Sequence, residues 1–192
     1  MASLANVLVW MDLEMTGLEP DRHVIVEIAT LITNDALEVM SEGPDLVVHA
    51  DEQQLEQMGE FVTAMHTRSG LLTKIVASEI TVSEAEQQTL KYLRDAGVEI
   101  GTIPLAGNSI GTDRRFLQEY MPELESYFHY RNVDVSTIKE LATRWYPETL
   151  RHRSEKASSH RALDDIRESI AELEFYRSNI FVLPNDVRVA TT

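Results

Sequence analysis

An apolar stretch that ends in two acidic residues constrains the fold of this chain most. Residues 7–11, VLVWM, are all apolar, and Asp12 and Glu14 follow within the next three positions. Side chains alternate across a β-strand, so Trp10 shares a face with both acids while Leu13 lies on the opposite face. A run that is apolar on both faces predicts a central strand that other elements cover on both sides.

The two acids would stand together at the C-terminal end of this strand, just before the chain breaks at Thr16 and Gly17. Carboxylates that share a face repel each other, so the arrangement is costly unless positive charge lies between them. Two interpretations are open for this stretch alone. The acids form a cation-binding pair, or the strand end simply emerges into water.

The composition indicates one globular α/β domain. The chain has 192 residues, of which 43% are hydrophobic and 26% are charged, and this balance is typical of a folded domain with a substantial core. We predict a single domain over residues 1–183 and a flexible C-terminal tail over residues 184–192. The absence of cysteine excludes disulfides and thiolate metal sites. No apolar run of membrane-spanning length and no signal peptide is recognisable, so we expect a cytoplasmic protein without membrane association.

The charge balance restricts the partners that the chain can bind. Asp and Glu number 32 against 17 Lys and Arg, for a net charge of −15. Proteins that grip long nucleic acids usually carry a basic surface, because each phosphate contact needs a nearby cation. We therefore expect no binding of long DNA or RNA. An anionic substrate would be small, and metal ions would supply much of the attraction.

The order of the predicted elements indicates a mixed central sheet flanked by helices. An opening β-meander precedes alternating helices and strands, a pattern typical of an α/β domain. Thr81 and Glu84 form a capping-box pair, Gly97 ends that helix, and Ser136 is the predicted N-cap of a later one. After the first strand, we predict strands over residues 23–33, 45–49, 103–107 and 131–135, and helices over residues 51–58, 81–97, 111–121, 136–146 and 160–179.

A third acid follows a glycine-containing turn at the end of a predicted strand. Asp113 stands in GNSIGTDRRF, near the start of a helix. Open α/β sheets place their sites at such strand ends. The alternative is that Asp113 only favours the helix dipole or pairs with a nearby arginine.

The last helix begins with HRALDD and supplies a further acid and a histidine. Asp165 lies near two small residues, Ala162 and Ser169, which leave room for an ion. Asp164 has a like-charged neighbour one turn later, an arrangement that suits a solvated face, so Asp165 is the better ligand candidate. We expect His160 in the loop or the first turn, where a surface or capping role is the simpler alternative.

Together these residues predict a metal site at one edge of the sheet. Four carboxylates without cysteine favour hard divalent cations, Mg²⁺ or Mn²⁺, over zinc. Two such ions can activate a water molecule and stabilise the leaving oxygen of a phosphodiester. A nearby histidine can supply the general base.

The order Asp-x-Glu, then Asp, then His-x4-Asp resembles the DEDDh family of 3′→5′ exonucleases. The segments VWMDLEMTGL, HTRSGL, GNSIGTDRRF, YMPELESYFHYRNVDVSTIKEL and HRALDDIRESIAEL are similar to segments of the branch of that family that acts on very short RNA, and they occur in the same order over nearly the whole chain. The resemblance implies an RNase H-like fold, two divalent cations per site and a cytoplasmic homodimer. It also implies hydrolysis of short oligoribonucleotides, especially dinucleotides, to mononucleotides.

The resemblance further implies roles for residues at matching positions. It makes His160 the general base and Tyr130 a catalytic residue. Tyr130 and His66 would complete the site from across the dimer interface. The implied metal ligands are Asp12, Glu14, Asp113 and Asp165.

The remaining matched positions concern the substrate. Leu18 resembles a residue wedged against the bases, and Phe61 a stacking partner. Ser109 and Thr112 would contact the nucleotide. Arginine offers a fork for phosphate, and a helix N-terminus favours anions. The implied pocket for a 5′-phosphate therefore consists of Arg131, Ser136 and Thr137, although plain helix capping is an alternative for the last two.

Two positions depart from the family pattern. Phe61 stands where tryptophan is common, so stacking keeps a π face with less area. Thr112 stands where glutamine is frequent, which puts one polar contact in doubt. We assign no role to the loop over residues 151–159. Glu27 lies in mid-strand, where support of the site is one possibility.

Three other functions remain as alternatives. A DEDDh exonuclease for longer strands is disfavoured by the net charge and by the implied phosphate pocket. A catalytically silent nucleotide-binding module conflicts with the complete set of five site residues. An acidic scaffold does not explain the linear order of the motifs.

Overall fold

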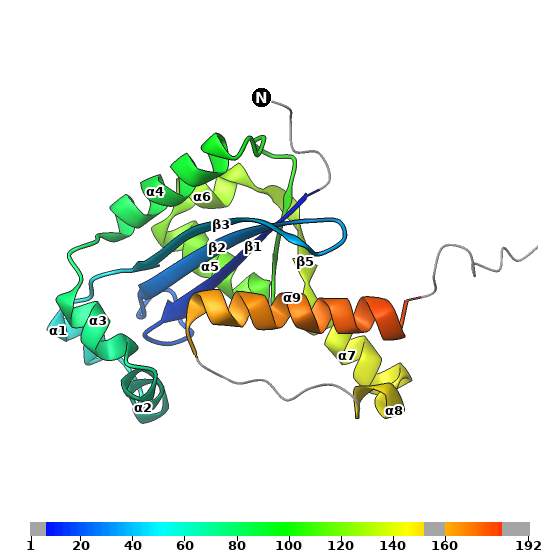
Figure 1. The fold of residues 1–192 in the computed structure, drawn as a ribbon. Coiled ribbons are helices and arrows are strands. Elements are labelled where there is room, and N and C mark those ends of the chain that lie inside the picture. Colours follow the sequence, from blue (N-terminus) through cyan, green and yellow to red (C-terminus); the bar gives the residue numbers. More distant parts are fainter. Residues whose placement is uncertain (1–6, 152–159, 182–192) are drawn as a thin grey trace, which may run out of the picture.

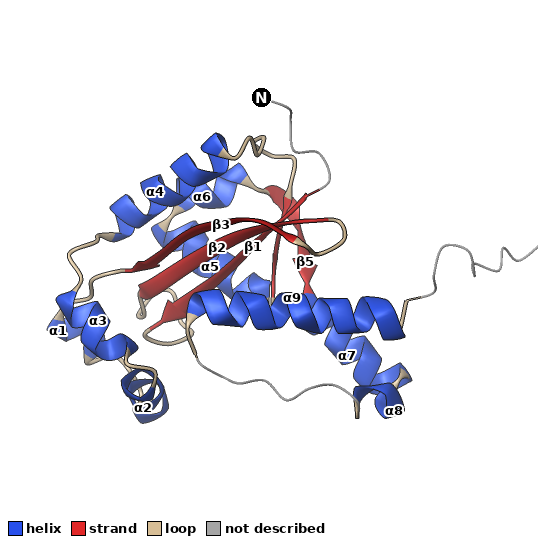
Figure 2. Cartoon of the chain, in the orientation of Figure 1, coloured by secondary structure: helices blue, strands red, loops and turns tan. Residues whose placement is uncertain are grey.

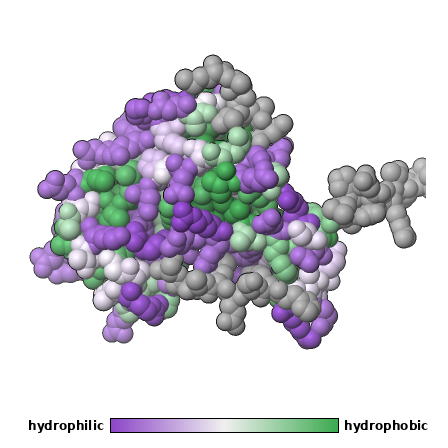
Figure 3. Space-filling model, in the orientation of Figure 1, coloured by the Kyte–Doolittle hydropathy of each residue, from purple (hydrophilic) through white to green (hydrophobic). Residues whose placement is uncertain are grey.

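The computed structural model describes residues 7–151 and 160–181. The predicted tail over residues 184–192 and nearly all of the loop over residues 151–159 lie outside this part of the chain. Within it, no helix is both long enough and apolar enough to cross a membrane. Figure 3 shows hydrophilic side chains over much of one face of the molecule, with hydrophobic patches between them.

The core of the fold is one five-stranded mixed sheet in the order β3-β2-β1-β4-β5. The first three strands form an antiparallel meander, and β4 and β5 add in parallel beside β1. This arrangement confirms the predicted meander, the mixed sheet and the central place of the first strand. The strands are β1 Val7–Met15, β2 Ile25–Asn34, β3 Val39–Val47, β4 Pro104–Gly107 and β5 His129–Asp134.

Helices cover both faces of this sheet. In Figures 1 and 2, α9 crosses one face, and α4, α5 and α6 lie against the other. The small helices α1, α2 and α3 gather near one end of the sheet (Figure 1). The helices are α1 Glu52–Leu55, α2 Glu60–Arg68, α3 Leu71–Ala77, α4 Val82–Asp95, α5 Ile110–Tyr120, α6 Pro122–Tyr127, α7 Val135–Trp145, α8 Pro147–Leu150 and α9 Ala162–Asn179.

The two faces of β1 pack into different cores, as the alternation of its side chains predicts. Val9 and Leu13 join the core beneath α4, α5 and α6, which includes Phe116. Trp10 is fully buried in the second core, with Ile166 of α9. Asp12 and Glu14 share the face of Trp10, so β1 directs both acids toward the side of the sheet that α9 covers.

The local start and stop signals hold for α4 but not for α7. The capping box of Thr81 and Glu84 is formed in both directions, and Gly97 has the left-handed φ of 78° expected after a helix. The predicted N-cap Ser136 is wrong by two residues. Asp134 is the N-cap of α7, and its Oδ1 accepts hydrogen bonds from Ser136 N at 2.9 Å and Ser136 Oγ at 2.7 Å. Asp and Ser are about equally good N-caps. Strand β5 ends at Asp134 and α7 begins at the next residue, so Asp134 occupies the N-cap position.

Several elements differ from the sequence-based expectation. Strand β3 begins at Val39, well before the predicted strand over residues 45–49, because an irregular edge strand carries the chain through Gly43 and Pro44. Helices α2 and α3 were not predicted. The N-cap of α2 is Gly59, which makes no side-chain capping bond, and His66 is its only buried residue, so the sequence gives little helical periodicity to detect. Helix α6 follows α5 directly because a proline occupies its first turn.

Candidate active site

The two acids of β1 lie where the strand leaves its regular register. Across the antiparallel ladder, Asp12 pairs with Ala29 and Glu14 pairs with Glu27, and the register then shifts between Glu14 and Met15. Glu14 is buried and Asp12 nearly so. The strand therefore holds two carboxylates on one face in a poorly hydrated place, where charge is costly without a cation.

Asp113 reaches these acids from the turn after β4. This strand pairs with β1 only through Leu105 and Ala106, so the edge of β1 beyond Trp10 has no neighbouring strand on that side. The first turn of α5 occupies this space. Asp113, which is 6% exposed, accepts a hydrogen bond on Oδ1 from Leu13 N at 3.0 Å. A third carboxylate is thereby fixed to the backbone of the residue between the two acids of β1.

The turn that carries Asp113 depends on a close approach of the backbone. A Cβ added to Gly107 would lie 2.9 Å from Met11 O and 2.8 Å from Ile110 Cδ1. Ser109 then adopts a left-handed φ of 59°, which is uncommon for a residue with a side chain. The GNSIG segment thus folds tightly against β1.

The N-terminus of α9 brings the histidine and the last acid to the same place. One ligand atom each of Glu14, His160 and Asp165 lies within 4.8 Å of the other two. His160 precedes the helix with a left-handed φ of 50°. Asp164 is exposed and lies 3.4 Å from Arg167, on the solvated side of the helix. The structure therefore places Asp165 at the site and Asp164 away from it.

Burial and mutual repulsion change the acidity of this cluster. Burial, followed by the charges of Asp113, Asp165, Glu14 and Glu27, raises the pKa of Asp12 well above its ordinary value. Burial, followed by the charges of Asp165, Glu27 and Asp113, raises the pKa of Glu14 from 4.5 to about 8, although the charge of Arg161 opposes this. Burial raises the pKa of Asp113 to about 7, although the hydrogen bond from Leu13 N opposes this. Without a cation, these carboxyl groups therefore keep their protons to a higher pH than exposed carboxyl groups do.

His66 lies beside Glu14 of its own chain. It is fully buried, its Nε2 lies 3.0 Å from Met15 O, and its Nδ1 lies 4.0 Å from Glu14 Oε2. A carbonyl oxygen can only accept, so Nε2 carries the proton in this contact. The side chain has no exposed surface to offer a partner, which favours a place for His66 in the site of its own chain over the expected reach into the partner's site.

Asp134 joins two of the residues predicted to bind substrate. Its Oδ1 accepts a hydrogen bond from Ser109 N at 3.0 Å in addition to the two bonds from Ser136. The turn after β4 and the start of α7 are thus held together. Thr137 lines a neighbouring depression of about 490 Å³ with Asp134, and Thr112 lies in the first turn of α5, with its N–H bonded to Ser109 O.

Three other predicted substrate residues, and the predicted catalytic residue Tyr130, lie on the surface. Leu18 is 68% exposed, Phe61 76% and Tyr130 76%. Arg131 is also exposed, and its guanidinium carbon lies 5.5 Å from the centre of the Tyr130 ring. Large apolar side chains at such exposure are available to contact a ligand or a partner.

Two charged residues lie at the site, one without any role predicted from the sequence, Arg161, and one for which support of the site was only a possibility, Glu27. Glu27 is fully buried in β2, and both of its oxygens accept hydrogen bonds from Arg161, which immediately follows His160. A carboxylate within a buried, β-branched strand is the same signal that identified Asp12. The local sequence could not identify Arg161 as the partner of Glu27, because Arg161 lies 134 positions further along the chain.

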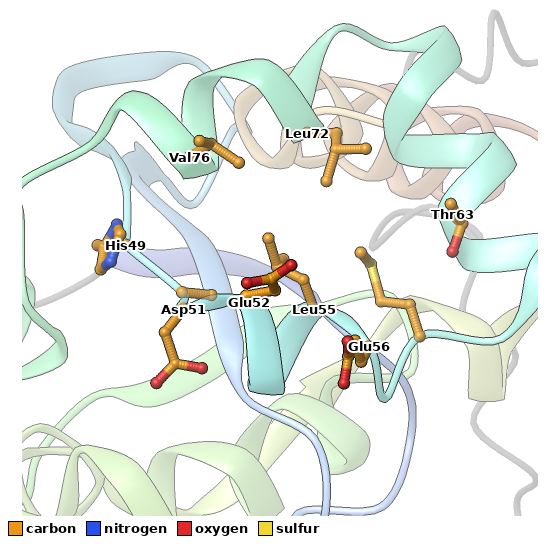
Figure 4. Close-up of a pocket in the computed structure, with 10 residues that line it drawn as sticks. His49, Asp51, Glu52, Leu55, Glu56, Thr63, Leu72 and Val76 are labelled. Carbon is orange, nitrogen blue, oxygen red and sulfur yellow. The ribbon is translucent and has the colours of Figure 1, made fainter.

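A larger cavity lies apart from these residues. It has a volume of about 730 Å³ and is lined by residues of α1, the start of α2, and α3. In Figure 4, Leu72 and Val76 of α3 face Leu55 of α1 across the opening, and Glu52 and Glu56 lie on the α1 side. None of the predicted site residues lines this cavity.

Comparison with known proteins defines the class of enzyme. Residues 9–173 match the RNase T family, described as exonuclease. The fold is similar to that of E. coli exonuclease I, solved in complex with a dA16 oligonucleotide, with a TM-score of 0.70 at 12% identity over 92% of this chain and 42% of that chain. The chain is a metal-dependent exonuclease with an RNase H-like fold, as the sequence predicts.

Close relatives identify the family to which the chain belongs within this class of enzymes. The chain is 55% identical to the oligoribonuclease of Vibrio vulnificus over 91% of its own length and 95% of that protein. It is 54% identical to the oligoribonuclease of Yersinia enterocolitica over 93% of its length and 98% of that protein. The chain belongs to the oligoribonuclease family of DEDDh exonucleases, which confirms the resemblance seen in the sequence.

Proposed function

We propose that this chain is a 3′→5′ exoribonuclease that hydrolyses short oligoribonucleotides, dinucleotides above all, to 5′-mononucleotides with the help of two divalent cations. The observation that carries the proposal is the convergence of four carboxylates and a histidine from β1, α5 and the start of α9 at one edge of the sheet. The similarity to oligoribonucleases supports the choice of RNA as substrate.

The residues at the site fit divalent cations. Carboxylate oxygens are the ligands that Mg²⁺ and Mn²⁺ prefer. The raised pKa values of Asp12, Glu14 and Asp113 reflect repulsion and burial that bound cations would relieve. Asp12, Glu14, Asp113 and Asp165 would hold the ions. When bound, such ions supply positive charge that activates water and stabilises the leaving oxygen of a phosphodiester.

His160 is the proposed general base. Its imidazole lies beside Glu14 and Asp165, a position from which it would reach a water molecule that approaches the scissile phosphate. His160 would take the proton of that water as the new phosphorus–oxygen bond forms. Tyr130 would contribute its hydroxyl from the second subunit of a homodimer, as a donor to the phosphate or to the attacking water.

The surface residues would select a short substrate. Leu18 and Phe61 offer exposed apolar side chains against which two bases can stack. Arg131, Ser136 and Thr137 would hold a 5′-phosphate, with Ser109 and Thr112 along the nucleotide. Such a pocket closes behind a dinucleotide, whereas a longer strand would extend beyond it. We further propose one catalytic domain over residues 1–183 and a cytoplasmic homodimer.

A length series of 5′-labelled RNAs tests this function. Cleavage of chains from a dinucleotide to about 20 nucleotides would be compared in Mg²⁺, in Mn²⁺ and in chelator, with Asp12→Asn as the inactive control. We expect metal-dependent cleavage that is fastest for the 5′-phosphorylated dinucleotide. Equal rates on long and short chains would favour an exonuclease for longer strands. A lack of cleavage at every length with either metal would refute the proposal.

A further inference from the structure

Glu27 makes an unusual set of contacts for a residue in the middle of a sheet. It has no exposed surface, yet its carboxylate accepts bonds from Arg161 Nε at 2.9 and 3.2 Å and a further bond from Arg161 Nη2. Its Oε2 also accepts a bond from Ala162 N at 3.0 Å. Glu27 therefore binds the side chain and the backbone at the start of α9.

These contacts give α9 an N-terminal cap from another strand. Arg161 occupies the N-cap position and makes no side-chain capping bond. The carboxylate of Glu27 takes this role instead by accepting the N–H of Ala162, and its charge favours the positive end of the helix dipole. The start of the helix is thus fixed to β2.

The bonds between Glu27 and Arg161 also restrain both functional residues of this segment. His160 is joined directly to Arg161 and has the left-handed φ of 50°. Asp165 N donates to Arg161 O at 2.9 Å, so Arg161 is also one turn before the acid. On the other side, Glu27 is the register partner of Glu14. Fixing Arg161 on Glu27 therefore sets His160 and Asp165 relative to Glu14.

Stability alone is a weak reason for such a pair. Replacing a buried ion pair by apolar residues of similar size is often neutral or stabilising, while removal of one partner is costly. The fork of arginine on a carboxylate does add directional hydrogen bonds that apolar contacts lack. Directional hydrogen bonds can fix the position of catalytic groups that must be placed to within a few tenths of an ångström.

We propose that Glu27 and Arg161 are positioning residues that hold His160 and Asp165 at the catalytic cluster. This inference rests on the proposed function, since it assigns a purpose to the geometry of that site. The pair touches neither substrate nor the reacting atoms. It acts through the turn that it fixes, so its loss would weaken metal binding and slow the chemical step without changing the surface that binds the substrate.

The test compares this pair with a second ion pair on the same helix. Arg167 of α9 also bonds a glutamate of the sheet, Glu42 of β3, at 2.8 Å, but both side chains are about half exposed. Arg161→Gln and Arg167→Gln would be compared for kcat and KM on a dinucleotide and for Mn²⁺ affinity by calorimetry without substrate. We expect Arg161→Gln to lose about 10- to 100-fold in kcat and in Mn²⁺ affinity with KM unchanged, as for lost outer-shell partners. Arg167→Gln should match the parent protein.

A double variant separates positioning from stability. Glu27→Leu combined with Arg161→Met removes both charges and refills the space, and it serves equally if Arg161→Gln does not fold. We expect its melting temperature to approach that of the parent protein while kcat and Mn²⁺ affinity stay low. Recovery of both in the double variant, or normal values in Arg161→Gln, would overturn the proposal. Inactivity of the parent protein toward RNA would instead refute the proposed function. The Mn²⁺ titration would still show whether the Glu27–Arg161 pair affects metal binding.

Discussion

Asp113 Oδ1 accepts a hydrogen bond of 3.0 Å from the backbone N–H of Leu13, the residue between Asp12 and Glu14. Strand β4 is too short to pair with β1 at Leu13, so this N–H has no partner in that strand. The carboxylate of α5 accepts its hydrogen bond instead. The side chain is fixed before any cation binds. The fold thus holds carboxylates that repel each other close together, and divalent ions would relieve this repulsion.

The first prediction concerns the four acids. Asp12→Asn, Glu14→Gln, Asp113→Asn and Asp165→Asn should each lower turnover by more than the roughly 100-fold cost of losing an outer-shell partner, because a direct ligand is removed. Melting temperatures in chelator should stay the same or rise, since repulsion is relieved. Asp164→Asn is the matched control on the same turn of α9 and should remain active. An active Asp165→Asn enzyme beside an inactive Asp164→Asn enzyme would reverse the ligand assignment.

The second prediction is a pH dependence of the metal-free protein. The folded state raises the pKa of Glu14 from 4.5 to about 8, mainly through burial. Between these values the folded chain keeps a proton that the unfolded chain has lost, so rising pH favours unfolding. Stability from this group is complete below the lower value and is lost as pH rises through the upper one. In chelator, the melting temperature should therefore fall more between about pH 5 and pH 8.5 for the parent protein than for Glu14→Gln. Saturating Mg²⁺ should reduce the difference, and parallel curves in chelator would contradict the raised pKa.

The sequence predicts the acidic half of the site better than its supporting contacts. Asp12 and Glu14 stand out because they interrupt an apolar strand, and Asp165 because of its small neighbours. The contacts of Asp113 with Leu13 and of Glu27 with Arg161 join residues 100 and 134 positions apart. Local periodicity carries no information about such pairs, which depend on how the sheet edge and α9 pack.

The same limit explains the errors in the fold. Strand β1 and helix α4 have strong local signals, an apolar run and a capping box, and both form as predicted. Helix α2 lacks an N-terminal side-chain cap and buries only His66. That burial beside Glu14 is a tertiary effect, so neither the helix nor the true place of His66 could be obtained from the local sequence.

The third prediction assigns the proton transfer to His160. His160→Asn should lower kcat by about 10²- to 10⁴-fold with KM for a dinucleotide nearly unchanged, as is usual for the loss of a general base. Asparagine keeps a polar side chain and tolerates the left-handed φ of 50° at this position. Single-turnover rates over a range of pH would measure the effect. The rise of rate with pH that reports the base should disappear in the variant, and a defect confined to binding would remove His160 from the chemistry.

The fourth prediction concerns selection for short chains. Arg131→Ala should weaken binding of a 5′-phosphorylated dinucleotide by about 1.5–3 kcal/mol, the usual value of a hydrogen bond to a charged group. A dinucleotide with a free 5′-hydroxyl should be affected little, and preference for short substrates should decrease. Arg144→Ala, which removes an exposed arginine of α7 instead of Arg131 of β5, is the control. If Arg131→Ala weakens both dinucleotides equally, Arg131 does not bind the terminal phosphate.

The fifth prediction separates two residues that the sequence placed together at the subunit boundary. His66 is buried beside Glu14 of its own chain, whereas Tyr130 is 76% exposed and free to enter a partner's site. An Asp12→Asn subunit would be mixed with either a Tyr130→Ala or a His66→Ala subunit, each inactive alone. If Tyr130 acts across the interface, the mixed dimer has one site with both defects and one with neither, so activity should return.

The His66→Ala mixture supplies the matched control for this experiment. Asp12 and His66 belong to the same site of the same chain, so every site in that mixed dimer keeps one defect and the mixture should stay inactive. Native mass spectrometry would verify that heterodimers form in both mixtures. Heterodimers of the Tyr130→Ala mixture that remain as inactive as the His66→Ala mixture would show that Tyr130 also serves its own subunit, because only a residue that acts across the interface can complement a defect in the partner.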